Sequence, residues 1–482
     1  PGTPRARRRR RRALAAGVGA VAVALLGAQL VTDARERAVL AELRAVPGVR
    51  APVPETLAEV WRVPVDRLPY PVVPAGDGRL GARETATGTE LVALDPATGA
   101  DAWVLPLTSA PADAEDAIGT PFPTCDGPLA PGTARPGRLV CLVTDAWSRD
   151  AGLTSQEVPA TTSRLVAVRT SDGAVVADHD VTAAPSDVGA AGAAHDAASA
   201  ARPSVPATSL ALLGDVAVLG HPVEPDAVLV RAVDVATGEE LWRRPPVTIG
   251  PAAGEPAALR LRRAGDAVAV PGRGGFDLVA RDGTVLRHVA AGPTARTGGG
   301  LSLPEDDGLL VLDDDGWRLA TPQRDVRLPG TPLVAAVDDG SAGGLVLAVT
   351  ADGLHALATT TGAQRWSVSL PGVESALVVR GRVHALAPDG VHTYDARTGA
   401  PLWQRTHGVH DQYPAGPAAT DGQQLYVPVT DEDGGGTVLL RLGLGDGRAA
   451  TPLTVPRDVV SVSPRSQPLV GWTADGVAVG LR

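Results

Sequence analysis

Short runs of alternating apolar and polar residues, separated by turns rich in Asp and Gly, recur along most of the chain. The run LVALD at Leu91–Asp95 is typical of a strand. The D-x-x-T-G that begins at its last residue predicts a tight hairpin turn, because Asp and Thr can bond the turn backbone and Gly supplies a positive φ. The next strand carries a Trp, which suits packing between neighbouring sheets. The pattern predicts an all-β fold.

One such hairpin occurs in four clear copies, and in each copy the Gly precedes the Trp by four residues. The copies are Ala93–Trp103, Ala232–Trp242, Ala356–Trp366 and Thr393–Trp403, with the pairs Gly99 and Trp103, Gly238 and Trp242, Gly362 and Trp366, and Gly399 and Trp403. A fixed spacing repeated along a chain indicates a repeat architecture.

Degenerate copies keep the turn and lose the Trp. Their glycines are Gly173, Gly283 and Gly447, with Gly316 as a weaker candidate. A second paired run precedes several hairpins, as at Ser209–His221, so each repeat holds about four short strands. That is the signature of a propeller blade. Eight turn glycines predict eight blades, with seven as the alternative.

The end of the chain, Pro468–Leu481, is expected to complete the first blade and close the ring, because an open ring would expose strand edges. Insertions at about 105–135 and 182–206 are expected to be loops.

The N-terminal pattern is different. Residues 1–12 carry seven Arg and no acid, and residues 13–31 carry no charge. A helix over 13–31 would span roughly 29 Å, about the hydrocarbon thickness of a bilayer. The basic flank predicts a cytoplasmic tail at 1–12, a transmembrane signal-anchor helix at 13–31 and export of everything that follows. The alternative is a signal peptide cleaved near Leu26–Ala28.

Residues 32–66 are interpreted as a stalk with short helices. One helix is predicted over Asp33–Val46, where Val39, Leu40 and Leu43 share a face and Pro47-Gly48 ends the pattern. A second is predicted over Pro54–Val60. The propeller is expected to occupy residues 67–482.

Composition narrows the possible partners. The net charge is −10, and the body after residue 12 sums to −17, which argues against nucleic acid as a partner. Lys, Asn and Met are absent and all 44 basic residues are Arg, which indicates a GC-rich bacterial genome. Cys125 and Cys141 are the only cysteines. In an exported segment they predict one disulfide, with two unpaired thiols as the alternative.

Few residue clusters suggest chemistry. His407, His410 and Asp411 could hold a metal weakly, but a solvated interblade loop is the simpler interpretation. The acidic turns at 313–316 and 431–434 do not match the spacing of a calcium loop, and Asp-Gly is an ordinary hairpin turn. No G-x-S-x-G elbow is present. No catalytic or cofactor-binding residue is predicted.

The A-x-D-x-x-T-G-x-x-x-W element resembles the repeat of pyrroloquinoline-quinone-type (PQQ-like) propellers over roughly residues 75–482. That family includes quinoprotein alcohol dehydrogenases and non-enzymatic members such as the propeller lipoprotein of outer-membrane assembly. The resemblance implies that Trp103, Trp242, Trp366 and Trp403 dock neighbouring blades. The adjacent cysteine pair that often caps the quinone in these enzymes is missing, and the usual calcium set lacks its Asn.

The expected protein is therefore a membrane-tethered, extracytoplasmic propeller that acts as a non-enzymatic binding or scaffold protein in the bacterial cell envelope. It would have an envelope protein as its partner and no cofactor. The alternatives are a degenerate quinoprotein-type enzyme and an extracytoplasmic ligand sensor.

Overall fold

A computed structural model gives the fold of most of the chain. It describes residues 29–32, 34–46, 48–71, 80–85, 88–109, 117–119, 122–127, 137–150, 155–184, 205–224, 227–248, 261–272, 274–290, 296–302, 308–313, 315–406, 418–430, 437–463 and 469–482. Residues 13–28 of the predicted membrane span lie outside these ranges. Within them, no helix is both long and apolar enough to cross a membrane.

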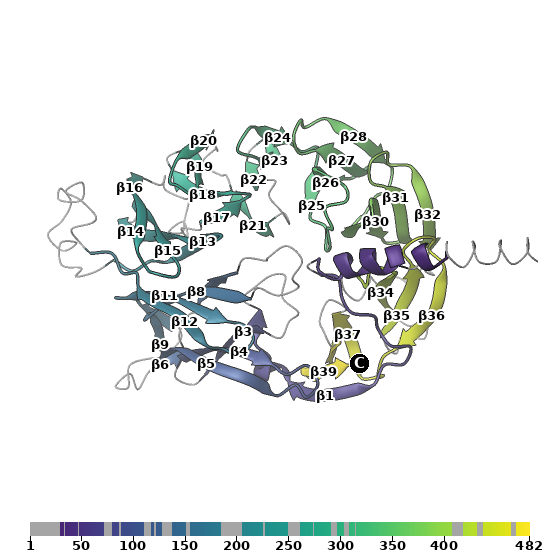
Figure 1. The fold of residues 1–482 in the computed structure, drawn as a ribbon, viewed down its shortest axis with the longest axis horizontal. Helices are drawn as coiled ribbons and strands as arrows, with labels where there is room; N and C mark the ends of the chain where they lie inside the picture. Colours follow the sequence, from purple (N-terminus) through teal and green to yellow (C-terminus); the bar gives the residue numbers. More distant parts are fainter. Residues whose placement is uncertain are drawn as a thin grey trace, which may run out of the picture.

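Nine four-stranded antiparallel sheets form a ring in the described part of the chain (Figure 1). We number these blades 1 to 9 in the order in which the chain begins their innermost strands, and we letter the strands of each blade A to D from the ring axis outward. Blade 1 comprises β2 (Tyr70–Pro71), β3 (Leu80–Glu84), β4 (Gly88–Leu94) and β5 (Asp101–Ser109).

Blades 2 to 4 continue the ring. Blade 2 comprises β7 (Thr124–Asp126), β8 (Arg138–Thr144), β11 (Ser163–Arg169) and β12 (Val175–Asp180). Blade 3 comprises β13 (Ser209–Leu213), β14 (Val216–Glu224), β15 (Ala227–Asp234) and β16 (Glu240–Thr248). Blade 4 comprises β17 (Arg262–Ala264), β18 (Ala267–Gly272), β19 (Gly275–Ala280) and β20 (Val285–Ala290).

Blades 5 to 8 have the same meander. Blade 5 comprises β21 (Arg296–Ser302), β22 (Leu309–Asp313), β23 (Gly316–Ala320) and β24 (Asp325–Arg327). Blade 6 comprises β25 (Thr331–Leu333), β26 (Leu345–Thr350), β27 (Gly353–Ala358) and β28 (Gln364–Val368). Blade 7 comprises β29 (Ser375–Val379), β30 (Arg382–Ala387), β31 (Gly390–Asp395) and β32 (Pro401–Thr406). Blade 8 comprises β33 (Ala419–Thr420), β34 (Gln424–Thr430), β35 (Thr437–Gly443) and β36 (Ala449–Thr454).

Blade 9 is built from both ends of the described chain. Its strands A to C are β37 (Val459–Ser463), β38 (Leu469–Thr473) and β39 (Val477–Leu481), and strand D is β1 (Glu59–Pro64). β1 pairs with β39 from Glu59 opposite Leu481 to Pro64 opposite Val477. The 3₁₀ turn η1 (Val65–Arg67) then leads to blade 1.

The prediction of eight or seven blades is wrong for a physical reason. A blade made from one continuous stretch has a turn between strands C and D, but in blade 9 these strands come from opposite ends and share no turn. The C-terminal strands therefore do not complete blade 1, which has four strands of its own. Gly316 begins β23, and the C–D turn of blade 5 is the glycine-free stretch 321–324.

The segment before blade 1 also differs from expectation in part. Residues 34–43 are helical, as predicted within Asp33–Val46. No helix forms over 54–60: the chain bends at residues 55 and 56 and enters β1 at Glu59, where it pairs with β39 instead.

The apolar core lies between blades. Leu165 of blade 2 and Leu219 of blade 3, for example, belong to one buried cluster. Both faces of a blade pack against neighbouring blades, so a strand can be buried along its whole length, as β13 is. A separate sheet of three strands leaves the ring at blade 2 and comprises β6 (Ala117–Gly119), β9 (Trp147–Asp150) and β10 (Ser155–Val158).

Candidate functional site

The sequence-predicted metal candidates give no described site. His407, His410 and Asp411 lie outside the described residues. Among the residues that the structure does describe, no three His, Cys, Asp or Glu side chains are grouped to hold a metal ion.

The described carboxylates of the acidic turns form ion pairs with arginines. Asp313 forms an ion pair with Arg318, with 3.2 Å between Oδ2 and Nε, and Asp315 pairs with Arg327 at 3.1 Å. The turn at 431–434 lies outside the described ranges. The visible carboxylates therefore neutralise neighbouring arginines.

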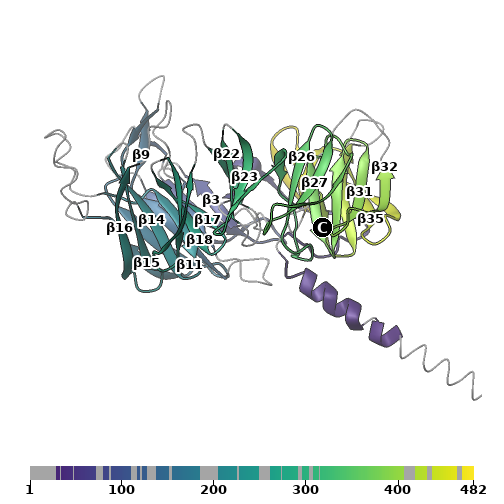
Figure 2. The ribbon, with the colours of Figure 1, turned by 90° about the horizontal axis from the view of Figure 1, so that it is seen from above.

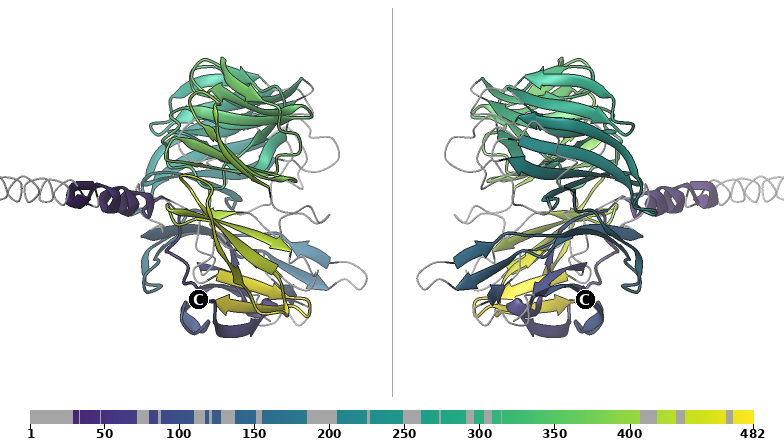
Figure 3. Two further views of the ribbon diagram at one scale, coloured as in Figure 1. Left: turned by 90° about the vertical axis from the view of Figure 1, so that its right-hand side faces the viewer. Right: turned by 90° about the vertical axis from the view of Figure 1, so that its left-hand side faces the viewer.

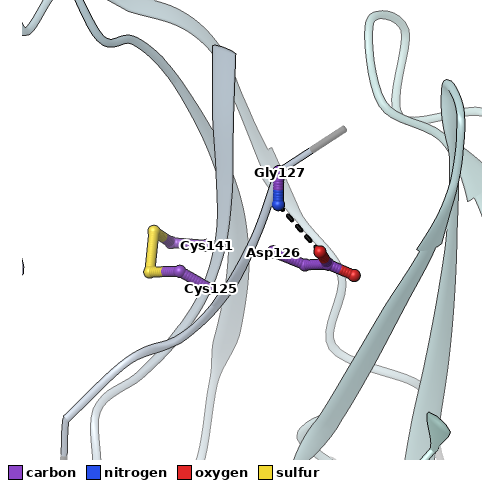
Figure 4. The surroundings of a disulfide bond; sticks show 4 residues. All are labelled: Cys125, Asp126, Gly127 and Cys141. Atoms are coloured by element: carbon purple, nitrogen blue, oxygen red, sulfur yellow. Dashed lines mark hydrogen bonds between the residues drawn. A yellow bond between two sulfur atoms is a disulfide. The ribbon is translucent and has the colours of Figure 1, made fainter. Parts of the chain in front are cut away.

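The predicted disulfide between Cys125 and Cys141 is present (Figure 4). The two residues are opposite each other on β7 and β8, with Cα atoms 4.0 Å apart. β7 is only three residues long and is the innermost strand of blade 2. The bond therefore fastens a short strand at the ring axis to the rest of its blade.

Asp126, the next residue, points away from the disulfide in Figure 4 and joins blade 2 to blade 3. Its carboxylate accepts hydrogen bonds from the backbone N–H of Leu212 on β13, at 3.0 Å, and of Gly127, at 2.8 Å. Burial raises the pKa of Asp126, and these two hydrogen bonds oppose the rise. Two successive residues of the short strand β7 thus make different links: Cys125 binds its own blade through the disulfide, and Asp126 binds the next blade through a hydrogen bond.

Five tryptophans bridge neighbouring blades in one geometry. Each indole N–H donates to a backbone carbonyl in the C–D turn of the next blade at 2.8 to 3.3 Å, and each ring lies against the turn glycine. The sets are Trp61 with Pro96 and Gly99, Trp103 with Thr170 and Gly173, Trp242 with Arg281 and Gly283, Trp366 with Ala396 and Gly399, and Trp403 with Leu444 and Gly447.

Two residues that bridge blades, one of these tryptophans and a histidine, could not be found from the repeat pattern. Trp61 belongs to no repeat, because it lies on β1, yet it docks blade 9 onto blade 1. His179 takes the place of the Trp between blades 2 and 3: its Nε2 is 3.1 Å from the carbonyl oxygen of Ala236, and its ring lies over Gly238. A pattern that requires Trp four residues after Gly cannot find either.

The segment before β1 is held on blade 8 by a buried polar cluster, which we call the N-terminal lock: Arg50, Tyr426 and Asp421. The guanidinium carbon of Arg50 lies 5.8 Å from the centre of the Tyr426 ring. Tyr426 donates its hydroxyl hydrogen to Asp421 at 2.8 Å and accepts one from the N–H of Val53 at 3.3 Å. Burial lowers the pKa of Arg50 to about 10 and raises that of Tyr426 to about 12.

Backbone contacts extend this attachment to the ring axis. Val49 forms a parallel bridge with Thr420 of β33, the innermost strand of blade 8, and Arg50 N–H donates to Thr420 at 2.9 Å. Leu40 and Leu43 of the helix are buried, and Leu43 lies over Gly422. The helix and residues 48–53 therefore belong to the packed fold.

The helix and the three-stranded sheet lie on opposite faces of the ring. Helix residue Glu36 pairs with Arg380 at 2.7 Å in the A–B turn of blade 7, and Gly422 is in the A–B turn of blade 8. The sheet interrupts the B–C connection of blade 2. In a meander these two kinds of turn lie at opposite ends of the strands, and Figures 2 and 3 show the separation. We call them the helix face and the far face.

Two buried histidines are held neutral. Nδ1 of His221 is 3.0 Å from the carbonyl oxygen of Val205, and its Nε2 accepts a hydrogen bond from Arg231 at 3.0 Å. Burial, and then the charge of Arg231, lower the pKa of His221 to about 4. Burial, and then Arg382, lower that of His384 to about 3. Neither can serve as a proton carrier near neutral pH.

A cavity of about 650 Å³ lies on the far face between blades 6 and 7. Its walls include Pro329, Thr331, Thr350 and Val373, and Glu374 is its only charged lining residue. Elsewhere, Tyr70 and Phe122 stack 5.5 Å apart at the starts of the inner strands of blades 1 and 2, with 66% and 45% of each residue exposed. Neither feature brings together groups for acid–base or nucleophilic chemistry.

Comparison with known proteins gives one family. The family described as "Outer membrane protein assembly factor BamB" matches residues 226–471. No curated protein matches the chain. Among solved structures, BamB from Moraxella catarrhalis is 15% identical, covers 89% of this chain and 100% of its own, and has a TM-score of 0.34. A europium-containing methanol dehydrogenase is 11% identical, covers 88% of this chain and 84% of its own, and has a TM-score of 0.35.

Proposed function

Because the chain belongs to the PQQ-like repeat propeller family described as outer membrane protein assembly factor BamB, we propose that it is a non-enzymatic binding or scaffold propeller of the bacterial cell envelope. The match over residues 226–471, which runs from blade 3 into blade 9, carries this proposal. The name of the family describes assembly of other proteins, so the partner class we propose is an envelope protein.

We further propose that residues 13–31 tether the propeller to the cell membrane, with residues 1–12 in the cytoplasm and the propeller outside it. The apolar span and its basic flank support this topology. The predicted span would continue into residues 34–43, which the Glu36–Arg380 pair and the contact of Leu40 and Leu43 with Gly422 attach to blades 7 and 8. Such an attachment fixes the helix face toward the membrane.

The topology is tested on the full chain with an epitope after Arg482, expressed in a bacterial host. We expect the protein to stay in the membrane pellet after carbonate extraction, and the epitope to be digested by protease in spheroplasts without lysis. A control chain that begins at residue 32 should be absent from the exported fraction. Release by carbonate with a new N-terminus near residue 29 would show a cleaved signal peptide, and a protected epitope would exclude export.

The enzymatic alternative is tested separately by calorimetric titration of the purified full chain with pyrroloquinoline quinone and with calcium. The proposed function predicts no saturable heat for either ligand. Saturable binding of both would replace the scaffold with a quinoprotein-type enzyme.

A further inference from the structure

The three-stranded sheet on the far face is an insertion with a rigid base. Its strands β9 and β10 lie in the chain between strands B and C of blade 2, and β6 is its third strand. At the base, the carboxylate of Asp145 accepts hydrogen bonds from the N–H groups of Thr161 and Thr162 at 2.7 and 2.8 Å, and from the Thr161 hydroxyl at 2.5 Å. Burial would raise the pKa of Asp145, but these hydrogen bonds outweigh it and hold the pKa below its usual range.

The two edges of the sheet are not equivalent. β9 is central, with β10 on one side and β6 on the other. β10 pairs with β9 without a break from Ser155 opposite Asp150 to Val158 opposite Trp147. The pairing of β6 shifts between Ala117 and Gly119. An irregular edge resists addition of another strand, whereas a regular edge presents its N–H and C=O groups in register. Among the described strands, none pairs with the outer edge of β10.

One surface of this hairpin carries groups typical of protein interfaces. Side chains alternate along a strand, so Trp147 and Arg149 of β9 share a surface with Val158 and Gln156 of β10. The Arg149 guanidinium donates to the amide oxygen of Gln156 at 2.9 Å through Nε. Because Gln156 is neutral and no described carboxylate pairs with Arg149, its positive charge is available to an incoming carboxylate. Trp and Arg are the side chains most enriched at binding hot spots.

We propose that the outer edge of β10 docks an extended segment of a partner protein, which adds to the sheet as a fourth strand. The segment would place an apolar residue near Trp147 and Val158 and a carboxylate near Arg149. Main-chain hydrogen bonds would supply affinity and these side chains specificity. The inference rests on the proposed binding function and names its surface and partner chemistry.

The position of the sheet supports a protein segment as the occupant. The helix face carries the helix that follows the predicted tether, so the far face is open to other envelope components. An acidic chain repels nucleic acid. Strand addition uses the backbone that every polypeptide shares, whereas a lipid or a glycan offers no row of N–H and C=O groups.

The test uses the full chain in detergent micelles, panned against a phage-displayed library of 12-residue peptides. We expect selected peptides to lose at least tenfold in affinity on Trp147→Ala, and about threefold to tenfold on Arg149→Gln. The matched control is Leu402→Ala, an apolar residue 46% exposed on β32 of blade 7, which should change affinity less than twofold. One selected peptide, synthesised again with N-methyl groups on alternate residues, should no longer bind, because the methyl groups remove main-chain N–H donors.

A chain in which Gly-Gly replaces residues 147–158 keeps Asp145, Thr161 and Thr162, and it serves if Trp147→Ala fails to fold. The proposal is overturned if no peptide is selected, if the selected peptides bind this shortened chain unchanged, or if N-methylation has no effect. None of these outcomes bears on carbonate extraction or protease access, so failure of the docking edge is distinguishable from failure of the envelope function.

Discussion

Single residues decide how neighbouring blades fit, and the contact between Trp366 and Gly399 shows how little space remains for a larger side chain. Gly399 has φ of +70°, and a Cβ built on it would lie 2.7 Å from the Cβ and Cγ atoms of Trp366. The turn therefore needs glycine for its conformation and also for space. Gly381 has φ of +69° with no atom within 4 Å of a built Cβ. The two positions separate backbone strain from crowding.

We predict that Gly399→Ala destabilises the protein more than Gly381→Ala. Both changes cost about 1 to 2 kcal/mol for the left-handed conformation. Gly399→Ala adds a further loss of about 1 to 3 kcal/mol in the free energy of unfolding, because the indole of Trp366 must move. Chemical denaturation of the full chain followed by Trp fluorescence gives the two free energies of unfolding. Equal losses would mean that the indole does not press on the turn.

The sequence predicts many of these residues because the turn chemistry is local. All four glycines of the clear copies, and Gly173, Gly283 and Gly447, have positive φ and lie in C–D turns. Trp61 and His179 could not be predicted, because their partners are distant in sequence or their residue type departs from the repeat. The N-terminal lock was missed for the same reason: 371 residues separate Arg50 from Asp421, and no local pattern links them.

At the level of elements, β1 is the strand whose position was least predictable. It lies within residues 32–66, which were interpreted as a stalk, and its alternation is too short to indicate a partner. In the structure it covers the edge of β39 and brings Trp61 onto blade 1. The backbone of Ala58 also exchanges two hydrogen bonds with Arg482, at 2.7 and 2.9 Å. An exported fragment that begins after residue 66 would lack this strand.

We predict that a fragment of residues 67–482 is less stable than one of residues 48–482 and tends to associate. The longer fragment lacks the helix but keeps Arg50, β1 and Trp61, so it controls for loss of the N-terminal region. Without β1, the apolar strand β39 becomes an exposed edge. Thermal unfolding and light scattering measure both effects. If the two fragments had similar melting temperatures and both had the molar mass of a monomer in solution, β1 would not close the ring.

The disulfide gives a second prediction for an element. Replacing both Cys125 and Cys141 by Ala should lower the free energy of unfolding by about 3 kcal/mol, the value for a closed loop of about 15 residues. Denaturation of the parent protein in reductant should give the same loss, and reductant should not affect the variant. A variant as stable as the oxidised parent would contradict the expected tethering of β7.

At the scale of the whole molecule, two buried histidines in different blades make the stability of this acidic chain depend on pH. Unfolded histidine titrates near pH 6.5. In the fold, the pKa of His221 is about 4 and that of His384 about 3. Below pH 6.5 the unfolded chain therefore binds protons that the folded chain excludes. The free energy of unfolding then decreases as the pH is lowered, until each folded pKa is reached.

We predict that the free energy of unfolding decreases between pH 6.5 and pH 4, by about 3 kcal/mol for His221 alone. The full chain is denatured in urea at several pH values in this window. His221→Gln should lower stability at pH 7 and reduce the slope by one proton. An unchanged slope in that variant would show that His221 does not contribute to the pH dependence.

Because blade 9 joins β1 to β39, the ring has a fixed order of completion during synthesis. Roughly 400 residues separate these paired strands. At 5 to 20 residues per second the ribosome takes about 20 to 80 s to cover that interval. Throughout it, the first strand made has no partner, while blades 1 to 8 can already assemble. The pairing of β1 with β39 is thus the last contact formed around the ring: a translational pause before residue 477 prolongs the time spent as an open arc, and premature release there leaves the arc open.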